Sequence, residues 1–370
     1  MQKPISRAMV SVQSTTLADG EKKLLNQYNP LGVNLFARNI ETKEQVKILI
    51  EQIKEAVGRD DVLIAVDQEG GRVARFRPPF FKEYLPQRSI GSFENEKDQE
   101  RVAYLQSFLI AQELNDVGVN LNYAPCGDVL FDQTGMVLKS RCFSSDEKCV
   151  AKLAGAMVDT YLKNNIIPCV KHAPGHGRAS VDPHLELPVL DFSLDELKKD
   201  FYPFECLAQK TPMMMTAHIV LKEVDDLPVT QSQKVISKII RQTMGFDGFL
   251  ISDAIDMHAL KGNLSQKVKT SLSAGCDAIC YCMGELSGLE EVLKSVAPLT
   301  DRSLERFYSL KRVLDQKMTE NHDLNALWSE YEALKKQAIP FILGRNDLLS
   351  AVPPKLVTFI LKYLLLYKYF

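Results

Sequence analysis

The chain has 370 residues, of which 45% are hydrophobic and 25% charged, a composition typical of a globular protein and not of a disordered one. Its 45 Lys and Arg residues against 47 Asp and Glu residues leave a formal net charge of −2, without the basic excess that draws a protein to nucleic acid. The 8 cysteines form no Cys-x-x-Cys pair, which argues against a zinc ribbon or a thioredoxin-like site. The N-terminus lacks the apolar core of a signal peptide, and no apolar run is long enough to span a bilayer. We therefore expect a cytoplasmic protein without a transmembrane segment.

Short apolar runs rich in β-branched residues alternate with longer segments of helical periodicity. The runs that we predict as strands are Ala8–Val12, Gly32–Phe36, Val62–Val66, Val119–Tyr123, Ile167–Val170, Met213–Ala217, Gly248–Ile251 and Asp277–Cys282. Helices are predicted at Glu44–Val57, Glu100–Val117, Lys148–Asn164 and Ser232–Met244, and a capping box of Ser193 and Glu196 marks the start of another. This succession favours an α/β fold, the (β/α)8 TIM barrel. A doubly wound sheet is the alternative, but the Gly-rich turn expected after its first strand is absent.

The last part of the sequence predicts helices and not strands. We expect residues 1–300 to form the barrel and residues 301–338 to form a C-terminal helical extension that packs on it, with helices at Asp301–Lys317 and Asp323–Ala338. Residues 339–370 form an apolar tail, whose final stretch Leu356–Phe370 follows two prolines and is too short to cross a membrane. Packing on the barrel is the simplest interpretation of that stretch, and contact with a membrane or a partner is the alternative.

Polar and charged side chains follow almost every predicted strand at its C-terminal end. They are Arg38 and Asn39, the segment from Asp67 to Arg72, Asn122 and Asp128, Lys171 and His172, His218, and Ser252 and Asp253. In a TIM barrel all βα loops open onto one face, so these side chains would converge there. Loops are polar in any protein, but polar groups at six strand ends favour a functional site on that face.

The densest polar stretch runs from Lys171 to His184 and holds three of the 6 histidines. Two of them, His172 and His176, have the spacing of a helical zinc pair, but Pro174 and Gly175 between them interrupt the helix that would align them, so we expect no metal. Serine hydrolase and nucleotide-binding motifs are also absent.

Asp182 and His184 lie two residues apart in the same stretch. A neighbouring carboxylate favours the imidazolium form and fixes the tautomer of the ring, so the pair could serve as a general acid that later acts as a base. An incidental hydrogen bond within a polar loop explains the spacing equally well.

Three segments, in this order, carry a resemblance to a known family. They are Val66-Asp-Gln-Glu-Gly-Gly-Arg-Val73, Lys171-His-Ala-Pro-Gly-His-Gly177 with Asp182-Pro-His184, and Gly245-Phe-Asp-Gly-Phe-Leu-Ile-Ser-Asp253. Together they resemble the bacterial β-N-acetylglucosaminidases of glycoside hydrolase family 3, the single-domain kind used in cell-wall recycling. The resemblance covers about residues 8 to 315. It implies a retaining exo-enzyme without cofactor, which removes terminal β-1,4-linked N-acetylglucosamine from anhydro-muropeptides.

The resemblance also implies roles for single residues. Asp253 would be the nucleophile and the pair Asp182 and His184 the acid/base dyad, while the terminal N-acetylglucosamine would be held by Asp67, Arg75, Arg141, Lys171 and His172. The sequence departs from the family at Ser140, where a Glu precedes the sugar-binding Arg, and at Ala173, where an aromatic residue is usual. A phosphorylase or a broader β-glycosidase with the same residues stays open, as does an inactive sugar-binding barrel. We expect a saccharide as the partner, no nucleic acid, and a monomer.

Overall fold

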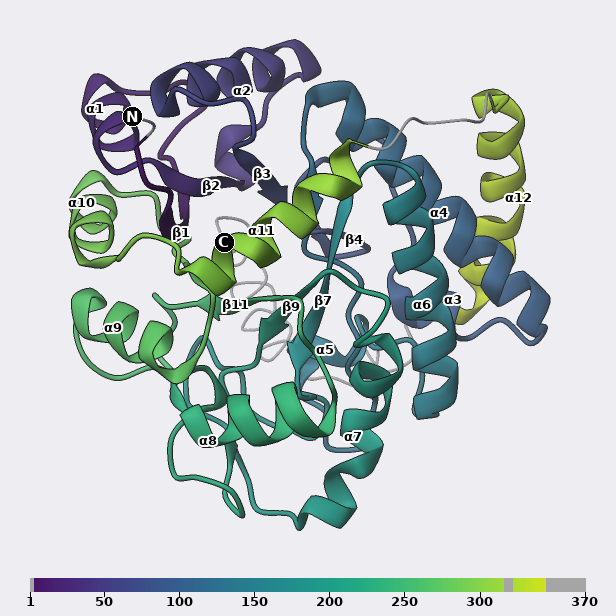
Figure 1. The fold of residues 1–370 in the computed structure, drawn as a ribbon. Coiled ribbons are helices and arrows are strands. Elements are labelled where there is room, and N and C mark those ends of the chain that lie inside the picture. Colours follow the sequence, from purple (N-terminus) through teal and green to yellow (C-terminus); the bar gives the residue numbers. More distant parts are fainter. Residues whose placement is uncertain (1–2, 316–321, 344–370) are drawn as a thin grey trace, which may run out of the picture.

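The computed structural model describes residues 3–315 and 322–343, and the centre of this part is a closed barrel of parallel strands (Figure 1). In chain order the barrel strands are β1 (Ser6–Ser11), β2 (Pro30–Leu35), β3 (Leu63–Val66), β6 (Leu121–Asn122), β7 (Ile167–Ala173), β9 (Met213–Thr216), β11 (Phe249–Ala254) and β12 (Ala278–Cys280). Each strand pairs with its neighbours in this order, and β12 closes the barrel on β1 with Ile279 opposite Ala8. The predicted (β/α)8 barrel is confirmed.

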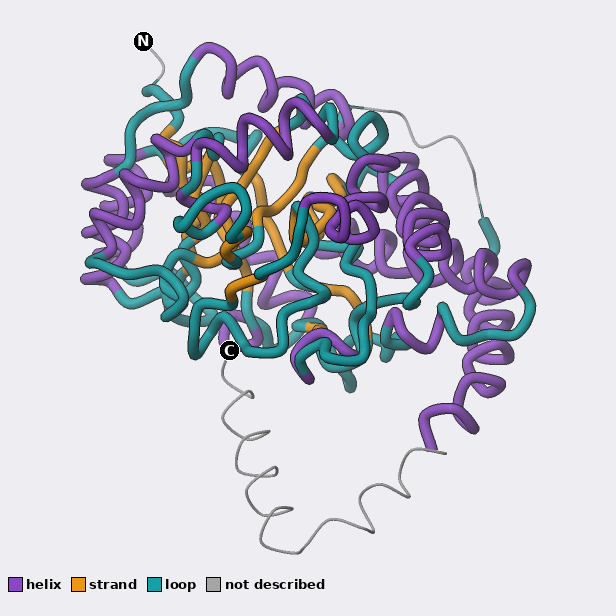
Figure 2. Tube along the Cα trace, turned by 90° about the horizontal axis from the view of Figure 1, so that it is seen from below, coloured by secondary structure: helices purple, strands orange, loops and turns teal. Residues whose placement is uncertain are grey.

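Helices in the connections surround the strands, which form the interior (Figure 2). The longer ones are α1 (Asp19–Tyr28), α2 (Lys43–Val57), α4 (Glu96–Val117), α6 (Glu147–Lys163), α7 (Leu194–Leu207), α9 (Leu264–Ala274) and α10 (Leu286–Ser295). Shorter elements are η1 (Ala37–Asn39), the hairpin of β4 (Gln68–Gly70) and β5 (Val73–Ala74), α3 (Gln87–Ile90), α5 (Met136–Lys139), the pair of β8 (Val189–Leu190) and β10 (Val220–Leu221), and η2 (Val229–Gln231). The predicted capping box is confirmed, because Ser193 N–H donates to Glu196 at 2.8 Å and Glu196 N–H donates to Ser193 Oγ at 3.3 Å.

Some elements differ in extent or type from the prediction. The strands β7 and β11 end three residues later than the predicted ends at Val170 and Ile251, so they include Lys171, His172 and Asp253. The fourth barrel strand, β6, is shorter because the side chain of Asn120 replaces the backbone ladder at its start: Oδ1 accepts from Ile64 N at 2.8 Å and Nδ2 donates to Val62 O at 3.0 Å. The predicted helix Ser232–Met244 begins as α8 (Gln233–Val235) and continues as the π-helical segment η3 (Ile236–Thr243). The backbone N–H of Met244 bonds there to the carbonyl of Ile239, five residues back, at 2.9 Å.

The barrel interior is filled by alternate residues of the strands, as the two-residue period of a strand requires. Met9 belongs to the interior cluster, whereas its neighbours Ala8 and Val10 pack outward against the helices. Helix α11 (Asp301–Leu314) lies across one end of the barrel in Figure 1 and adds Phe307 and Leu310 to the interior cluster.

Helix α11 covers the end of the barrel at which the strands begin. Asp247 and Asp277 lie just before β11 and β12, and Arg306 of α11 bonds to both, at 2.7 Å and 3.0 Å. The C-terminal ends of the strands, where the candidate residues lie, are therefore at the opposite end.

The last described helix, α12 (Leu324–Leu343), packs against α4 at the side of the barrel (Figure 1). A bidentate ion pair between Arg101 of α4 and Glu330 of α12, at 2.6 and 2.7 Å, joins their exposed faces. The apolar stretch Leu356–Phe370 lies outside the described residues. Within residues 3–315 and 322–343, no helix combines the length and the apolarity that a membrane span requires.

Candidate active site

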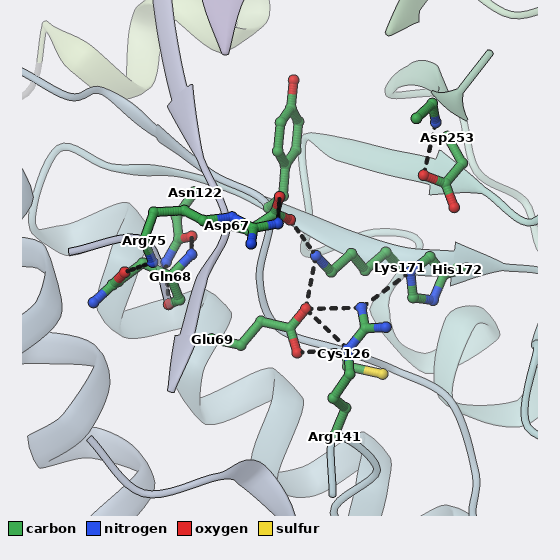
Figure 3. Close-up of polar contacts among 12 residues, drawn as sticks. Asp67, Gln68, Glu69, Arg75, Asn122, Cys126, Arg141, Lys171, His172 and Asp253 are labelled. Atoms are coloured by element: carbon green, nitrogen blue, oxygen red, sulfur yellow. Dashed lines mark hydrogen bonds and ion pairs between the residues drawn. The ribbon is translucent and has the colours of Figure 1, made fainter. Parts of the chain in front are cut away.

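Charged side chains from distant parts of the sequence meet at the C-terminal ends of the barrel strands. Figure 3 shows Asp67 and Glu69, which follow β3, together with Lys171 and His172 of β7, and Asp253 of β11 to one side. Parallel strands of a closed barrel end on one face, which explains why residues so far apart in sequence lie together.

The Lys171 ammonium group is the centre of this cluster. Its side chain is only 2% exposed, and Nζ lies 2.7 Å from Asp67 Oδ1 and 2.7 Å from Glu69 Oε1. Arg141, from the loop after β6, pairs with the same Glu69 through Nη2 at 2.8 Å and Nε at 3.0 Å. Arg75 Nη2 lies 3.3 Å from Asp67 Oδ2. Two carboxylates thus hold three cations in fixed positions.

These contacts keep Asp67, Glu69 and Lys171 charged. Burial would raise the pKa of Asp67, but the Lys171 ammonium and the Arg75 guanidinium outweigh it and hold that pKa well below its usual range. The pKa of Glu69 is likewise lowered, because Arg141 and Lys171 outweigh the effect of burial. Conversely, Asp67 and Glu69 raise the pKa of Lys171 against the opposing effect of its burial. The cluster presents fixed charged donors and acceptors, which suits the hydroxyl groups of a sugar.

His172 is held on both of its ring nitrogens. Nδ1 lies 2.7 Å from Asp128 Oδ2, and Nε2 lies 3.2 Å from Arg141 Nη2. Arginine can only donate, so Nε2 accepts and the proton resides on Nδ1, facing Asp128. Burial opposes ionisation of Asp128, yet His172 and His176 lower its pKa well below the usual range. Asp128 therefore fixes the tautomer and the orientation of the His172 ring beside Arg141.

Asp253 stands near the end of β11 and is partly exposed. Its Oδ1 accepts a hydrogen bond from Ala254 N–H at 2.7 Å. Burial would raise the pKa of Asp253, but the neighbouring His218 and His172 and the Ala254 N–H outweigh it, so the pKa is lowered and the side chain is an anion. The strand fixes its position, as a covalent catalyst requires.

Asp182 and His184 form the expected pair in the loop that follows β7. His184 Nδ1 lies 2.7 Å from Asp182 Oδ1, and the backbone N–H of His184 donates to the same oxygen at 3.0 Å. Burial lowers the pKa of His184, but Asp182 and then Asp253 more than compensate, so the net pKa is raised. Pro183 O between them accepts from Ala259 N–H at 3.1 Å, which ties this loop to the loop after Asp253.

A group of possible metal ligands lies beside this site. Cys126, Asp128 and His172 are buried, and one ligand atom of each lies within 4.8 Å of the others. Asp128 Oδ2 already accepts from Cys126 Sγ at 3.2 Å and pairs with His172. Burial lowers the pKa of the neighbouring His176 to about 4, so that ring is neutral. The hydrogen bonds of Asp128 account for this group without an ion.

The structure brings together the residues that the sequence singled out. Asp67, Arg75, Arg141, Lys171 and His172 form one connected cluster, Asp182 contacts His184, and Asp253 lies near enough to His184 to raise its pKa. Two further residues take part whose roles the sequence pattern does not assign. Glu69 pairs with Lys171 and Arg141, and Asp128 orients His172. The two-residue period gave a usable signal for Glu69, because it places Asp67 and Glu69 on one side of an extended segment.

The two departures from the family pattern have structural counterparts. Ser140 is the C-cap residue that follows α5 and directly precedes Arg141, and its carbonyl accepts from Arg88 N–H at 3.2 Å. Glu69, and not a residue next to Arg141 in sequence, supplies the carboxylate partner of the guanidinium. Ala173 is fully buried at the end of β7.

Comparison with known proteins places the chain in a well-populated group. Residues 6–315 match the family described as "Glycosyl hydrolase family 3 N terminal domain". The beta-hexosaminidase of Hydrogenovibrio crunogenus is 35% identical over 338 residues, which cover 88% of this chain and 92% of that protein. The beta-hexosaminidase of Bordetella avium is 35% identical over 310 residues, 81% of this chain and 87% of that protein. NagZ from Neisseria gonorrhoeae, solved in complex with N-trifluoroacetyl-D-glucosamine, superimposes with a TM-score of 0.78 at 28% identity and covers 90% of this chain and 97% of its own.

Proposed function

The chain belongs to glycosyl hydrolase family 3, and from this membership we propose that it is a retaining exo-β-N-acetylglucosaminidase that acts through a covalent glycosyl–Asp253 intermediate. The observation that carries the proposal is the geometry of His184: Nδ1 is bonded to Asp182 at 2.7 Å, on a loop tied to the one that follows Asp253. An ionised carboxylate and an imidazole paired with a second carboxylate are the two groups that a retaining mechanism needs here.

In this proposal the terminal sugar is held by Asp67, Arg75, Arg141, Lys171 and His172. Hydrogen bonds from charged groups contribute about 1.5–3 kcal/mol each, so a few of them suffice to fix one sugar ring. The cations and carboxylates neutralise one another before the sugar arrives, and this leaves their remaining donors and acceptors for its hydroxyl and acetamido groups.

The proposed nucleophile is the Asp253 oxygen that does not accept from Ala254. The bond from C1 to the leaving oxygen breaks as the bond from C1 to Asp253 Oδ2 forms, through an oxocarbenium-like state that the negative charge stabilises. The lowered pKa of Asp253 favours this step because only the ionised carboxylate attacks.

The proposed acid is His184. Its Nδ1 is engaged by Asp182, so Nε2 carries the proton that passes to the leaving oxygen. In the second step the neutral Nε2 takes a proton from the water that attacks C1, and Asp253 leaves as a carboxylate. An imidazole places less negative charge beside the leaving group than a second carboxyl would. This supports an anionic aglycone, and we propose the anhydro-muramyl peptide of a cell-wall recycling pathway in the cytoplasm.

Replacing Asp182 by Asn tests the pH dependence of this acid. Asp182 raises the pKa of His184, so the substitution lowers that pKa and the imidazolium is lost at a lower pH. We expect the alkaline limb of the kcat/KM profile of Asp182→Asn to move to lower pH, with a smaller loss of activity at the optimum than in His184→Ala. Profiles measured with a poor leaving group would show this, and an alkaline limb that stays in place would argue against the dyad.

One set of assays separates this proposal from its rivals. Nitrophenyl N-acetylglucosaminide and nitrophenyl glucoside are compared, each with and without inorganic phosphate. We expect release of nitrophenol from the N-acetylglucosaminide, free N-acetylglucosamine as the product, and no acceleration by phosphate. A sugar phosphate product would indicate a phosphorylase, comparable rates on the glucoside a broader β-glycosidase, and binding without turnover an inactive sugar-binding barrel.

A further inference from the structure

The hydroxyl group of a tyrosine in α12 hydrogen-bonds to a glutamine that contacts the backbone of the charged cluster. Tyr331 is fully buried, although residues 322–343 lie beyond the segment that matches the family. Its Oη accepts from Leu85 N–H at 2.9 Å and donates to Gln106 Oε1 at 2.7 Å. Burial raises the pKa of Tyr331, so the phenol keeps the proton that it donates.

Gln106 of α4 connects Tyr331 to the backbone of the active-site residue Glu69. Its side chain is completely buried, and Nε2 donates to the backbone carbonyls of Glu69 at 3.0 Å and Leu85 at 2.9 Å. Because Tyr331 engages Oε1, the orientation of the amide is fixed and Nε2 must face Glu69. One tyrosine and one glutamine thus connect α12 to the backbone of Glu69.

Glu69 is the residue on which the sugar-binding cations depend. Its carboxylate, 1% exposed, contacts Lys171 at 2.7 Å and Arg141 at 2.8 Å. The next residue, Gly70, has a φ of 107° and lies so close to Gln106 that a Cβ would approach Nε2 to 2.8 Å. The backbone at this point therefore has little freedom to shift independently of Gln106.

We propose that Tyr331 is a positioning residue for sugar binding, which acts through Gln106 and Glu69 on Lys171 and Arg141. A catalytic site loses efficiency when its groups are displaced by a fraction of an ångström, so a fixed backbone at Glu69 has a direct effect on binding. Helix α12 then contributes to the positioning of the active-site residues in addition to packing on the barrel. The inference rests on the proposed sugar-binding role of Lys171 and Arg141.

The ring of Tyr331 is anchored without its hydroxyl. Its centroid lies 5.9 Å from that of Tyr84 and 5.7 Å from that of Trp328, in a cluster of three aromatic rings. Tyr331→Phe therefore keeps the packing of α12 and removes only the two hydrogen bonds. This is the variant that separates positioning from folding.

The test measures the inhibition constant of free N-acetylglucosamine and the KM of an aryl N-acetylglucosaminide, well below the unfolding temperature. For Tyr331→Phe we expect both constants to rise by about three- to tenfold, the effect of ~1 kcal/mol of lost hydrogen bonding, with a smaller change in kcat. Glu330→Gln is the matched control, since it removes the exposed ion pair of α12 with Arg101. It leaves the hydrogen bonds of Tyr331 unchanged. Its constants should equal those of the wild type.

A double-mutant cycle with Gln106→Leu completes the test. If Tyr331 acts through Gln106, the two substitutions together should raise the inhibition constant no more than Gln106→Leu alone. Additive effects of the two substitutions would show that Tyr331 does not act through Gln106, and would overturn the proposal. Lys171→Ala, for which we expect at least a tenfold loss in kcat/KM, distinguishes the remaining outcomes. Unchanged constants in Tyr331→Phe beside a strong effect of Lys171→Ala would overturn the positioning role alone, whereas unchanged constants in both would overturn the proposed sugar site as well.

Discussion

Replacing Asp253 by Asn is expected to lower turnover by several powers of ten while sugar binding is largely kept. The amide has the size of the carboxylate and its oxygen can still accept from Ala254 N–H, but it lacks the charge and most of the nucleophilicity. Steady-state kcat on an aryl N-acetylglucosaminide, together with the inhibition constant of N-acetylglucosamine, would show the two effects separately.

Asp256 provides the matched control for this substitution. It lies on the loop after the same strand, and its Oδ1 accepts from Cys282 N–H at 2.8 Å, a bond that an asparagine oxygen can also accept. Burial raises the pKa of Asp256, so it is a poorer anion than Asp253. Asp256→Asn should retain turnover close to that of the wild type. Near-full turnover in Asp253→Asn, with a large loss in Asp256→Asn, would transfer the nucleophile assignment to Asp256.

Replacing His184 by Ala is expected to have an effect that depends on the leaving group. A sugar alkoxide needs a proton in order to leave, whereas a dinitrophenolate hardly does. His184→Ala should therefore nearly abolish hydrolysis of the natural disaccharide and should slow the first step with dinitrophenyl N-acetylglucosaminide much less. Water also needs the base, so the second step becomes limiting and a burst of phenolate should appear in pre-steady-state measurements.

Azide tests the second role of the same residue. Azide attacks the glycosyl intermediate without a base, so it should restore the turnover of His184→Ala on the dinitrophenyl substrate and yield a β-glycosyl azide. Retention of the β configuration would also support the covalent intermediate. If His184→Ala slows hydrolysis equally for both leaving groups and azide does not restore turnover, His184 is a structural loop residue and another group supplies the proton.

The alternation of strands and helices could be read from the sequence because each element satisfies its own periodicity. Alternate residues of β1 face the interior and the helices, as Met9 and its neighbours do, and the capping box of α7 is encoded by Ser193 and Glu196 alone. Candidate site residues were found for a similar reason. A polar side chain at the end of a barrel strand has one face to which it can project, so position along the chain predicts position in space.

Side-chain contacts between segments that are far apart in the sequence could not be predicted from periodicity. Asp67 and Glu69 both follow β3, but only the folded barrel shows that Lys171 lies between their carboxylates. It also shows that Arg141 pairs with Glu69. The hydrogen bond from Tyr331 to Gln106 joins residues that no spacing relates. Its partners are set by how α12 packs on α4, which depends on many side chains at once.

The covering of one end of the barrel by α11 has a consequence for synthesis on the ribosome. The first strand pairs with β12, and Phe307 must enter the interior before the hydrophobic core is complete. The active-site residues after β3 emerge early, yet they are held by neighbours on β7 and on the loop after β6. A nascent chain therefore leaves the apolar surface of the barrel interior incompletely buried until α11 has been translated. A premature stop just before α11 should yield a polypeptide that has every proposed reacting group and nevertheless aggregates without acquiring activity.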